Sequence, residues 1–141
     1  MSNQHLQANN FESELCSLKD TDTLKKLLPD LFCVFDDNCN DKSAFSLIHL
    51  IETVPDPYYV ECFLKNLRKS YTNSVYWTSV LFTRIMNNSD SLQYLKYYLY
   101  LADRETLLHL LSFIENDRYC TEEHKRIISD LRKRLGCDVL C

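Results

Sequence analysis

The sequence predicts an all-α protein, and three observations lead to that fold class. Only one of the 141 residues is glycine, Gly136, and only three are proline. Because tight hairpins and phosphate-binding loops depend on glycine, this composition disfavours an all-β fold and a nucleotide-binding loop. Apolar residues recur at helical spacing along most of the chain, and residues that commonly cap helices precede these stretches. With 45% of its residues hydrophobic, the chain can bury a core.

The apolar spacing predicts seven or eight short helices joined by short links, with no competing β-pattern. The expected helices occupy residues 11–18, 24–35, 42–54, 57–71, 73–87, 92–101, 107–114 and 122–135. Helices joined in this way pack as antiparallel neighbours, either in a bundle or in a helix-pair superhelix. The length favours a single domain over residues 1–141, in which the polar residues 1–10 form a disordered tail.

Start and stop signals delimit most of these helices. The expected caps are the cluster at residues 20–23, Asp41, Asp56 followed by Pro57, Thr72 or Asn73, Ser89 or Asp90, Asp103 and Thr121. Gly136 is the expected stop of the last helix. Pro29 interrupts an apolar segment, so the helix there is expected to bend or split.

Polar residues within the apolar segments predict a structural network. The helix over 42–54 is apolar almost all round and is expected to be central, so Glu52 on it needs a cation. Arg84 continues an apolar stripe that includes Trp77, and a bidentate Arg84–Glu52 pair would satisfy both charges. His49 lies three residues before Glu52 and could donate to one of two neighbouring carboxylates. The expected network is Asp36, Asp37, His49, Glu52, Trp77 and Arg84.

The same residue types also permit a catalytic hypothesis, a helical metal-dependent hydrolase that would use Asp36, Asp37, His49 and Glu52. Helical di-metal sites use paired Glu-x-x-His motifs, whereas this chain has one His-x-x-Glu. The sequence therefore favours a protein that is not an enzyme, without catalytic or metal-binding residues and without a cofactor.

Seven cysteines form no C-x-x-C pair, and there is no signal peptide and no apolar run long enough to span a membrane. These features predict reduced thiols in a cytoplasmic protein. Cys39 lies near acidic residues, but its spacing matches no standard zinc pattern.

Charge and tyrosine patterning predict a protein-binding surface. The net charge is −4, and residues 20–61 carry nine acids against three lysines. Such a surface repels nucleic acid and attracts basic proteins. Four tyrosines in the helix over 92–101 cannot all face the core, and exposed tyrosines are effective interface anchors. The candidate partner-binding residues are Asp30, Asp36, Asp37, Asp41, Asp56, Glu61, Tyr94, Tyr97, Tyr98 and Tyr100.

Residues 30–90 resemble a family of small bacterial immunity proteins that accompany polymorphic toxins, including those of contact-dependent growth inhibition. The resemblance rests on the run Phe35-Asp36-Asp37, the His-x-x-Glu of 49–52, and Trp77 followed by Arg84-Ile85-Met86-Asn87. It implies an all-helical cytoplasmic protein that binds and neutralises a cognate toxin domain, often a nuclease, at the C-terminal end of a large secreted exoprotein. A helix-repeat adaptor that binds a peptide is a further alternative. The sequence does not determine the oligomeric state.

Overall fold

The computed structural model describes residues 21–116 and 121–136, and in these residues it contains eight helices and no strand. The predicted all-α fold class is therefore confirmed. The helices are α2 (Thr21–Phe32), α3 (Asp41–Ile51), α4 (Asp56–Lys65), α5 (Leu67–Asn73), α6 (Val75–Asn87), α7 (Ser89–Leu101), α8 (Arg104–Asn116) and α9 (Glu122–Leu135). The predicted tail over 1–10 and helix over 11–18 lie outside the described residues.

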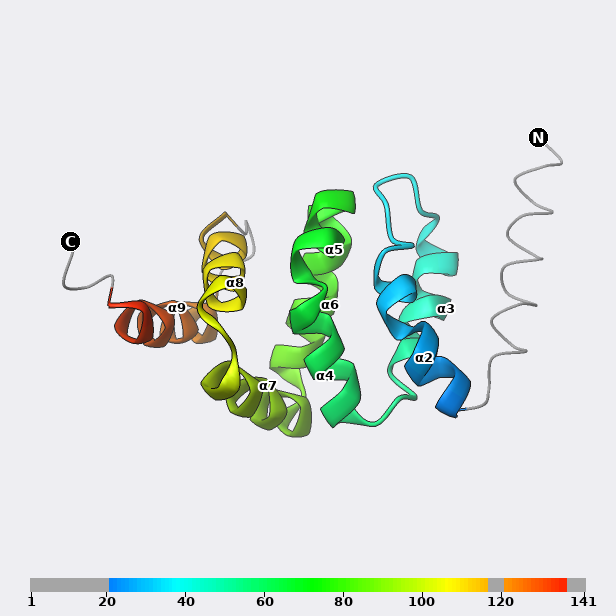
Figure 1. Cartoon of the computed structure of the whole chain (residues 1–141). Coiled ribbons are helices and arrows are strands. Elements are labelled where there is room, and N and C mark those ends of the chain that lie inside the picture. The colour runs from blue at the N-terminus through cyan, green and yellow to red at the C-terminus, as the bar shows by residue number, and fades with distance from the viewer. Residues whose placement is uncertain (1–20, 117–120, 137–141) are drawn as a thin grey trace, which may run out of the picture.

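The helices follow one another in a row, from α2 and α3 through α4, α5 and α6 to α8 and α9, with α7 crossing below them (Figure 1). The packing follows this order, because α2 contacts both α3 and α4, α5 contacts α6, and α8 contacts α9. Helix α7 packs mainly against α4 and α6. Of the two architectures left open by the sequence, this row corresponds to a helix-pair superhelix and not to a closed bundle.

Two side-chain pairs show that α3 and α6 run parallel and in register. The Phe45 and Trp77 rings lie edge to face with centroids 5.5 Å apart, and Arg84 binds Glu52. Both pairs join residues that are 32 apart in the sequence. Parallel packing of alternate helices is the arrangement of a helix-pair stack, in which each hairpin repeats the direction of the one before it.

A chain of packed aromatic rings forms the core and joins the two ends of the row. Phe32 of α2 packs against Phe63 of α4, which stacks on Phe82 of α6 with centroids 6.4 Å apart. Phe82 in turn contacts Phe113 of α8 and the buried His124 of α9. Ring pairs of this kind stabilise a core beyond the apolar area that they bury. Through them, one continuous core connects α2 to α9.

Pro29 does not interrupt its helix, whereas a break that the sequence does not predict occurs at Asn66. Helix α2 continues through Pro29 without splitting, and Pro29 is exposed, so the missing hydrogen bond falls on the solvent side of the helix. The helix predicted over 57–71 is instead broken at Asn66, which separates α4 from α5. The Asn66 side chain donates to the Cys62 carbonyl at 2.9 Å. The Asn66 backbone N–H donates to the same carbonyl at 3.1 Å, and side-chain bonds of this kind to the backbone favour asparagine at the ends of helices.

Four helices begin one residue or more away from the predicted cap. The cap predicted at Asp56 is wrong, because Pro55 is the N-cap of α4, without a side-chain hydrogen bond, and Asp56 and Pro57 are the first two residues of the helix. Side chains cap the other three helices. Asn40, Ser74 and Asn88 cap α3, α6 and α7, in place of Asp41, Thr72 or Asn73, and Ser89 or Asp90. Each of these three caps has the extended backbone that lets a side-chain oxygen accept from the first turn. The caps predicted at Asp103 and Thr121 and the stop at Gly136, whose φ is 70°, are confirmed.

Ser74 makes a testable contribution to the fold, because it is buried and its hydroxyl serves two elements. The hydroxyl accepts from the Trp77 backbone N–H at 3.1 Å and donates to the Asp37 carboxylate at 2.7 Å. We predict that Ser74→Ala lowers the free energy of unfolding by about 1–2 kcal/mol, because it removes a cap and a charge-assisted hydrogen bond. Chemical denaturation followed by circular dichroism measures this change.

Ser89→Ala is the matched control, since Ser89 is exposed and Asn88 supplies the cap of α7. We expect it to change stability by less than about 0.5 kcal/mol. Equal effects of the two substitutions would contradict the role given to Ser74.

Candidate functional site

The structure brings Glu52 and Arg84 together as a bidentate pair between α3 and α6. Arg84 donates from Nε to Glu52 Oε2 at 3.0 Å and from Nη2 to Oε1 at 2.8 Å. The side chains are 37% and 29% exposed, so water still reaches both charges. The hydrogen bonds from the guanidinium to Glu52 raise the pKa of Arg84 above its ordinary value. The pair fixes the register of two helices and carries no feature of a reacting group.

Asp36 and Asp37, which the sequence also predicts for the network, accept hydrogen bonds from residues other than His49. Asp37 accepts from the Ser74 hydroxyl, which ties the α2–α3 loop to the start of α6. Asp36 instead accepts from the Asn38 backbone N–H at 2.8 Å, inside its own loop. His49 is exposed on α3, and the hydrogen bond predicted from it to Asp36 or Asp37 is absent from the part of the chain that the structure describes. The four residues of the hydrolase hypothesis therefore do not converge.

The geometry also bears on metal binding. Within residues 21–116 and 121–136, no group of three or more His, Cys, Asp or Glu side chains is placed to hold a metal ion. Cys39 lies in the α2–α3 loop, where its thiol accepts from the Asp36 backbone N–H at 3.3 Å and donates to the Val34 carbonyl. These contacts shape the loop and leave the hydrolase hypothesis without a recognisable centre in the described residues.

Helix α3 does not bury all of its faces, which corrects the expectation that it is central. It buries Ala44, Leu47, Ile48 and Ile51 on one side. Asp41, Phe45 and His49, which are spaced four residues apart, form an exposed stripe on the other side. In the sequence, Asp41 and His49 lie one helical turn to either side of Phe45. This spacing indicates an exposed stripe, but a count of the apolar residues in the helix does not detect it.

An acidic edge, defined by Asp36, Asp37, Asp41, Phe45 and Tyr76, forms where the α2–α3 loop meets the start of α6. The Asp37–Ser74 hydrogen bond joins the loop to α6, and the Phe45 and Tyr76 rings both lie edge to face against the buried Trp77. All five residues of this edge are exposed. Of these five residues, the sequence predicts the three acids for the interface, and the structure adds the rings of Phe45 and Tyr76.

A tyrosine surface, defined by Tyr58, Tyr94, Tyr97 and Tyr98, covers the contact between α4 and α7. The Tyr97 and Tyr98 rings pack edge to face at 5.3 Å, and Tyr97 is 57% exposed. Burial raises the pKa of Tyr98, and the nearby Glu61, Tyr97, Tyr58 and Tyr94 add to this effect. The structure therefore groups three of the predicted tyrosines and Glu61, and it adds Tyr58 from α4.

The α4–α7 cleft adjoins this surface and has a volume of about 330 Å³. Its lining residues come from α4, from the end of α7 and from the turn into α8, and they are Glu61, Leu64, Lys65, Tyr98, Leu101, Ala102, Asp103 and Thr106. Leu101, at the end of α7, is 59% exposed. The cleft is an open, mostly apolar hollow with charged groups at its rim.

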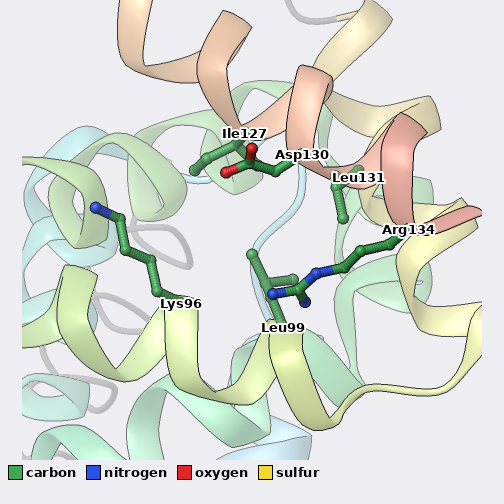
Figure 2. A pocket seen from close by; sticks show the side chains of 6 residues that line it. All are labelled: Lys96, Leu99, Ile127, Asp130, Leu131 and Arg134. Atoms are coloured by element: carbon green, nitrogen blue, oxygen red, sulfur yellow. The ribbon is translucent and has the colours of Figure 1, made fainter. Parts of the chain in front are cut away.

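The opposite flank of α7 forms a second hollow, the α7–α9 cleft, of about 220 Å³. Lys96 and Leu99 of α7 face Ile127, Asp130 and Arg134 of α9 across it (Figure 2). Tyr100 lies on this flank, with the Arg134 guanidinium 5.4 Å from the centre of its ring. Tyr100 is therefore separated from the other three predicted tyrosines, since one helix carries them on two sides.

Two predicted acids remain apart from both aromatic groups. Asp30 is exposed near the end of α2, and Asp56 is half-buried in the first turn of α4. Asp56 lies close enough to the buried Tyr59 to contribute to the raised pKa of that phenol, after the larger effects of burial and Glu52. Neither acid is joined to the acidic edge by a hydrogen bond between described residues.

In the described residues, ion pairs and helix caps hold the helices together, and aromatic and acidic side chains are exposed on the surface. The model of the Immunity protein 30 family matches residues 1–95, and the chain belongs to this family of immunity proteins. The match includes the acidic edge and ends inside α7. Searches of curated proteins and of solved structures returned no match. No described helix has the length and hydropathy needed to cross a lipid bilayer.

The Arg84–Glu52 pair is testable by a double-mutant cycle of Glu52→Gln and Arg84→Met. We predict a coupling free energy of about 1 kcal/mol that decreases in high salt, because the pair is bidentate but still reached by water. Thermal or chemical unfolding of the four proteins measures it. A coupling below about 0.2 kcal/mol would contradict a role in fixing the register of α3 and α6.

The cysteines give a prediction about pH. Cys33, Cys39 and Cys62 are free thiols, and burial raises the pKa of Cys62 to about 11, which the hydrogen bond from Asn66 only partly offsets. Because the thiolate is the reactive form, we expect iodoacetamide to alkylate Cys62 at about pH 8 roughly 100-fold more slowly than an ordinary cysteine.

Mass spectrometry of the modified peptide measures this rate for the folded protein, and the same peptide in denaturant is the control. The rate should increase up to about pH 11, the pKa of the folded state. Equal rates in the folded and denatured protein would contradict the burial of this thiol.

Proposed function

We propose that this chain binds a cognate toxin domain and neutralises it by covering the active cleft of the toxin or a surface beside it. The observation that carries the proposal is the family match over residues 1–95. The exposed aromatic rings support it, since tyrosine and phenylalanine are enriched in protein interfaces and are costly to leave in water. The toxin domain would be the C-terminal part of a large secreted exoprotein, and the encounter would take place in the cytoplasm.

The charge of the chain supports a basic partner such as a nuclease. Residues 20–61 carry nine acids against three lysines, and the acids of the acidic edge are exposed. A nuclease that binds phosphates has a positive surface, so the two proteins would attract each other before contact. The same charge opposes direct binding of nucleic acid by this chain.

Inhibition by coverage requires a rigid scaffold and no chemistry of its own. The aromatic core that runs from Phe32 to His124 supports the proposal that residues 1–141 act as a single unit. A rigid surface loses little conformational entropy when it binds, which favours tight association. The proposal therefore describes a stoichiometric inhibitor that is not an enzyme.

Co-expression tests the proposal. The toxin domain encoded beside this gene should kill host cells when it is expressed alone and should be harmless when this chain is present. The purified proteins should form a complex whose association rate falls about tenfold or more between about 0.05 and 0.5 M salt, because exposed charges attract at long range.

A catalytically inactive toxin domain is the control for expression level in this experiment. Failure of the chain to protect, with both proteins present, would end the proposal. Capture of a peptide-bearing protein other than the toxin would instead support the adaptor alternative.

A further inference from the structure

We infer that the α4–α7 cleft receives a lysine or arginine side chain of the toxin domain. This inference rests on the proposed function and specifies where the partner is bound and by which chemistry.

The walls of the cleft suit the alkyl part of a long basic side chain. Leu64 and Leu101 provide apolar surface, and the ring of Tyr98 closes one side. Lysine and arginine bury their methylene groups against apolar surface while their charged ends stay at polar positions. A hollow of about 330 Å³ that opens to the surface accommodates a single side chain of this kind.

The rim of the cleft favours a cation. Glu61 and Asp103 contribute two carboxylates, against one ammonium from Lys65. Asp103 accepts from the Thr106 backbone N–H at 2.8 Å, and this hydrogen bond lowers the pKa of Asp103, so it remains charged. Lys65 binds Glu61 at 2.8 Å, but its side chain is 69% exposed, so an incoming guanidinium can displace it into water.

The tyrosine surface beside the cleft already binds one ammonium group. The Lys25 Nζ atom lies 4.0 Å from the centre of the Tyr58 ring. A cation above an aromatic face is attracted by the electrons of the ring, and the attraction does not depend on which chain supplies the cation. The exposed rings of Tyr94 and Tyr97 offer the same interaction to a second protein.

The two other exposed features fit a basic side chain less well. At the acidic edge all five residues are exposed, so a basic side chain would pair with the carboxylates in water and would bury little of its alkyl part. The α7–α9 cleft has the opposite charge balance, since Lys96 and Arg134 outnumber Asp130 (Figure 2). Of the two clefts beside α7, the α4–α7 cleft combines an apolar hollow with an excess of negative charge.

The position of the cleft also suits partner discrimination. Glu61, Leu64 and Lys65 lie within residues 1–95, which the family model matches, whereas Leu101 and Asp103 lie beyond them. One wall of the cleft therefore lies in the part of the chain that the family model matches, and the other wall lies in the part that it does not match. Specificity between related partners arises from such local differences in fit and charge.

The experiment compares two double variants of the full-length chain that have the same net charge. Glu61→Gln with Asp103→Asn removes both carboxylates of the cleft, and asparagine preserves the cap of α8. The control, Glu122→Gln with Asp130→Asn, removes two exposed acids of α9 that lie outside the cleft, the tyrosine surface and the acidic edge. Isothermal titration with the purified toxin domain at about 0.15 M salt measures each Kd, and thermal unfolding confirms that both variants fold.

We expect the cleft variant to bind about 10- to 100-fold more weakly than the original chain, and the control to change Kd by less than about threefold. Lys65→Ala should tighten binding, because it removes the group that competes for Glu61, an effect that a purely structural role would not produce. Equal weakening by both double variants, or no change in any, would overturn the inference and leave the proposed function intact. If the unaltered chain does not bind the toxin domain, the proposed function itself fails, and the inference falls with it.

Discussion

The parallel register of α3 and α6 is the constraint on which the rest of this molecule depends. The Trp77 ring sets it at one end, and the Arg84–Glu52 pair sets it at the other. Aromatic packing supplies most of the stabilisation, since a half-exposed ion pair contributes little net free energy. The contribution of the ion pair is specificity, because a charged fork fits its carboxylate in one register and a slide of one helix along the other would separate them.

Given that register, the exposed features follow. The α2–α3 loop is held at the start of α6 through Asp37 and Ser74, which places the acids of the loop beside the Tyr76 ring. In the same way, the packing of α4 against α7 brings Tyr58 and Glu61 to the tyrosines of a distant part of the chain. Both surfaces therefore combine residues from helices that are neighbours in the row and separated in the sequence.

The sequence predicts the helices well because each leaves a local signal, either an apolar period or a capping residue. It also predicts the Arg84–Glu52 pair, since each charge lies on an apolar stripe and needs a partner. It does not predict the break at Asn66, because the apolar spacing continues from Val60 to Tyr71 and the Asn66 backbone N–H keeps its helical bond to Cys62.

The candidate surfaces are harder to predict than the helices. The exposure of Phe45 and the grouping of Tyr58 with the tyrosines of α7 depend on which helices pack together, and spacing along one helix does not contain that information. The predicted acids accordingly divide between the acidic edge and the α4–α7 cleft, with Asp30 and Asp56 apart from both.

Helix α7 is anchored through a narrow stripe of Ser91, Leu95 and Leu99, and most of its other side chains point outward on two flanks. Substitutions on those flanks leave the core untouched and so cost the fold little. Under the proposed function, these flanks would be free to change with the partner while the core and the fold are inherited unaltered. Adaptation to a new partner would then require a few substitutions on one exposed helix and no new architecture.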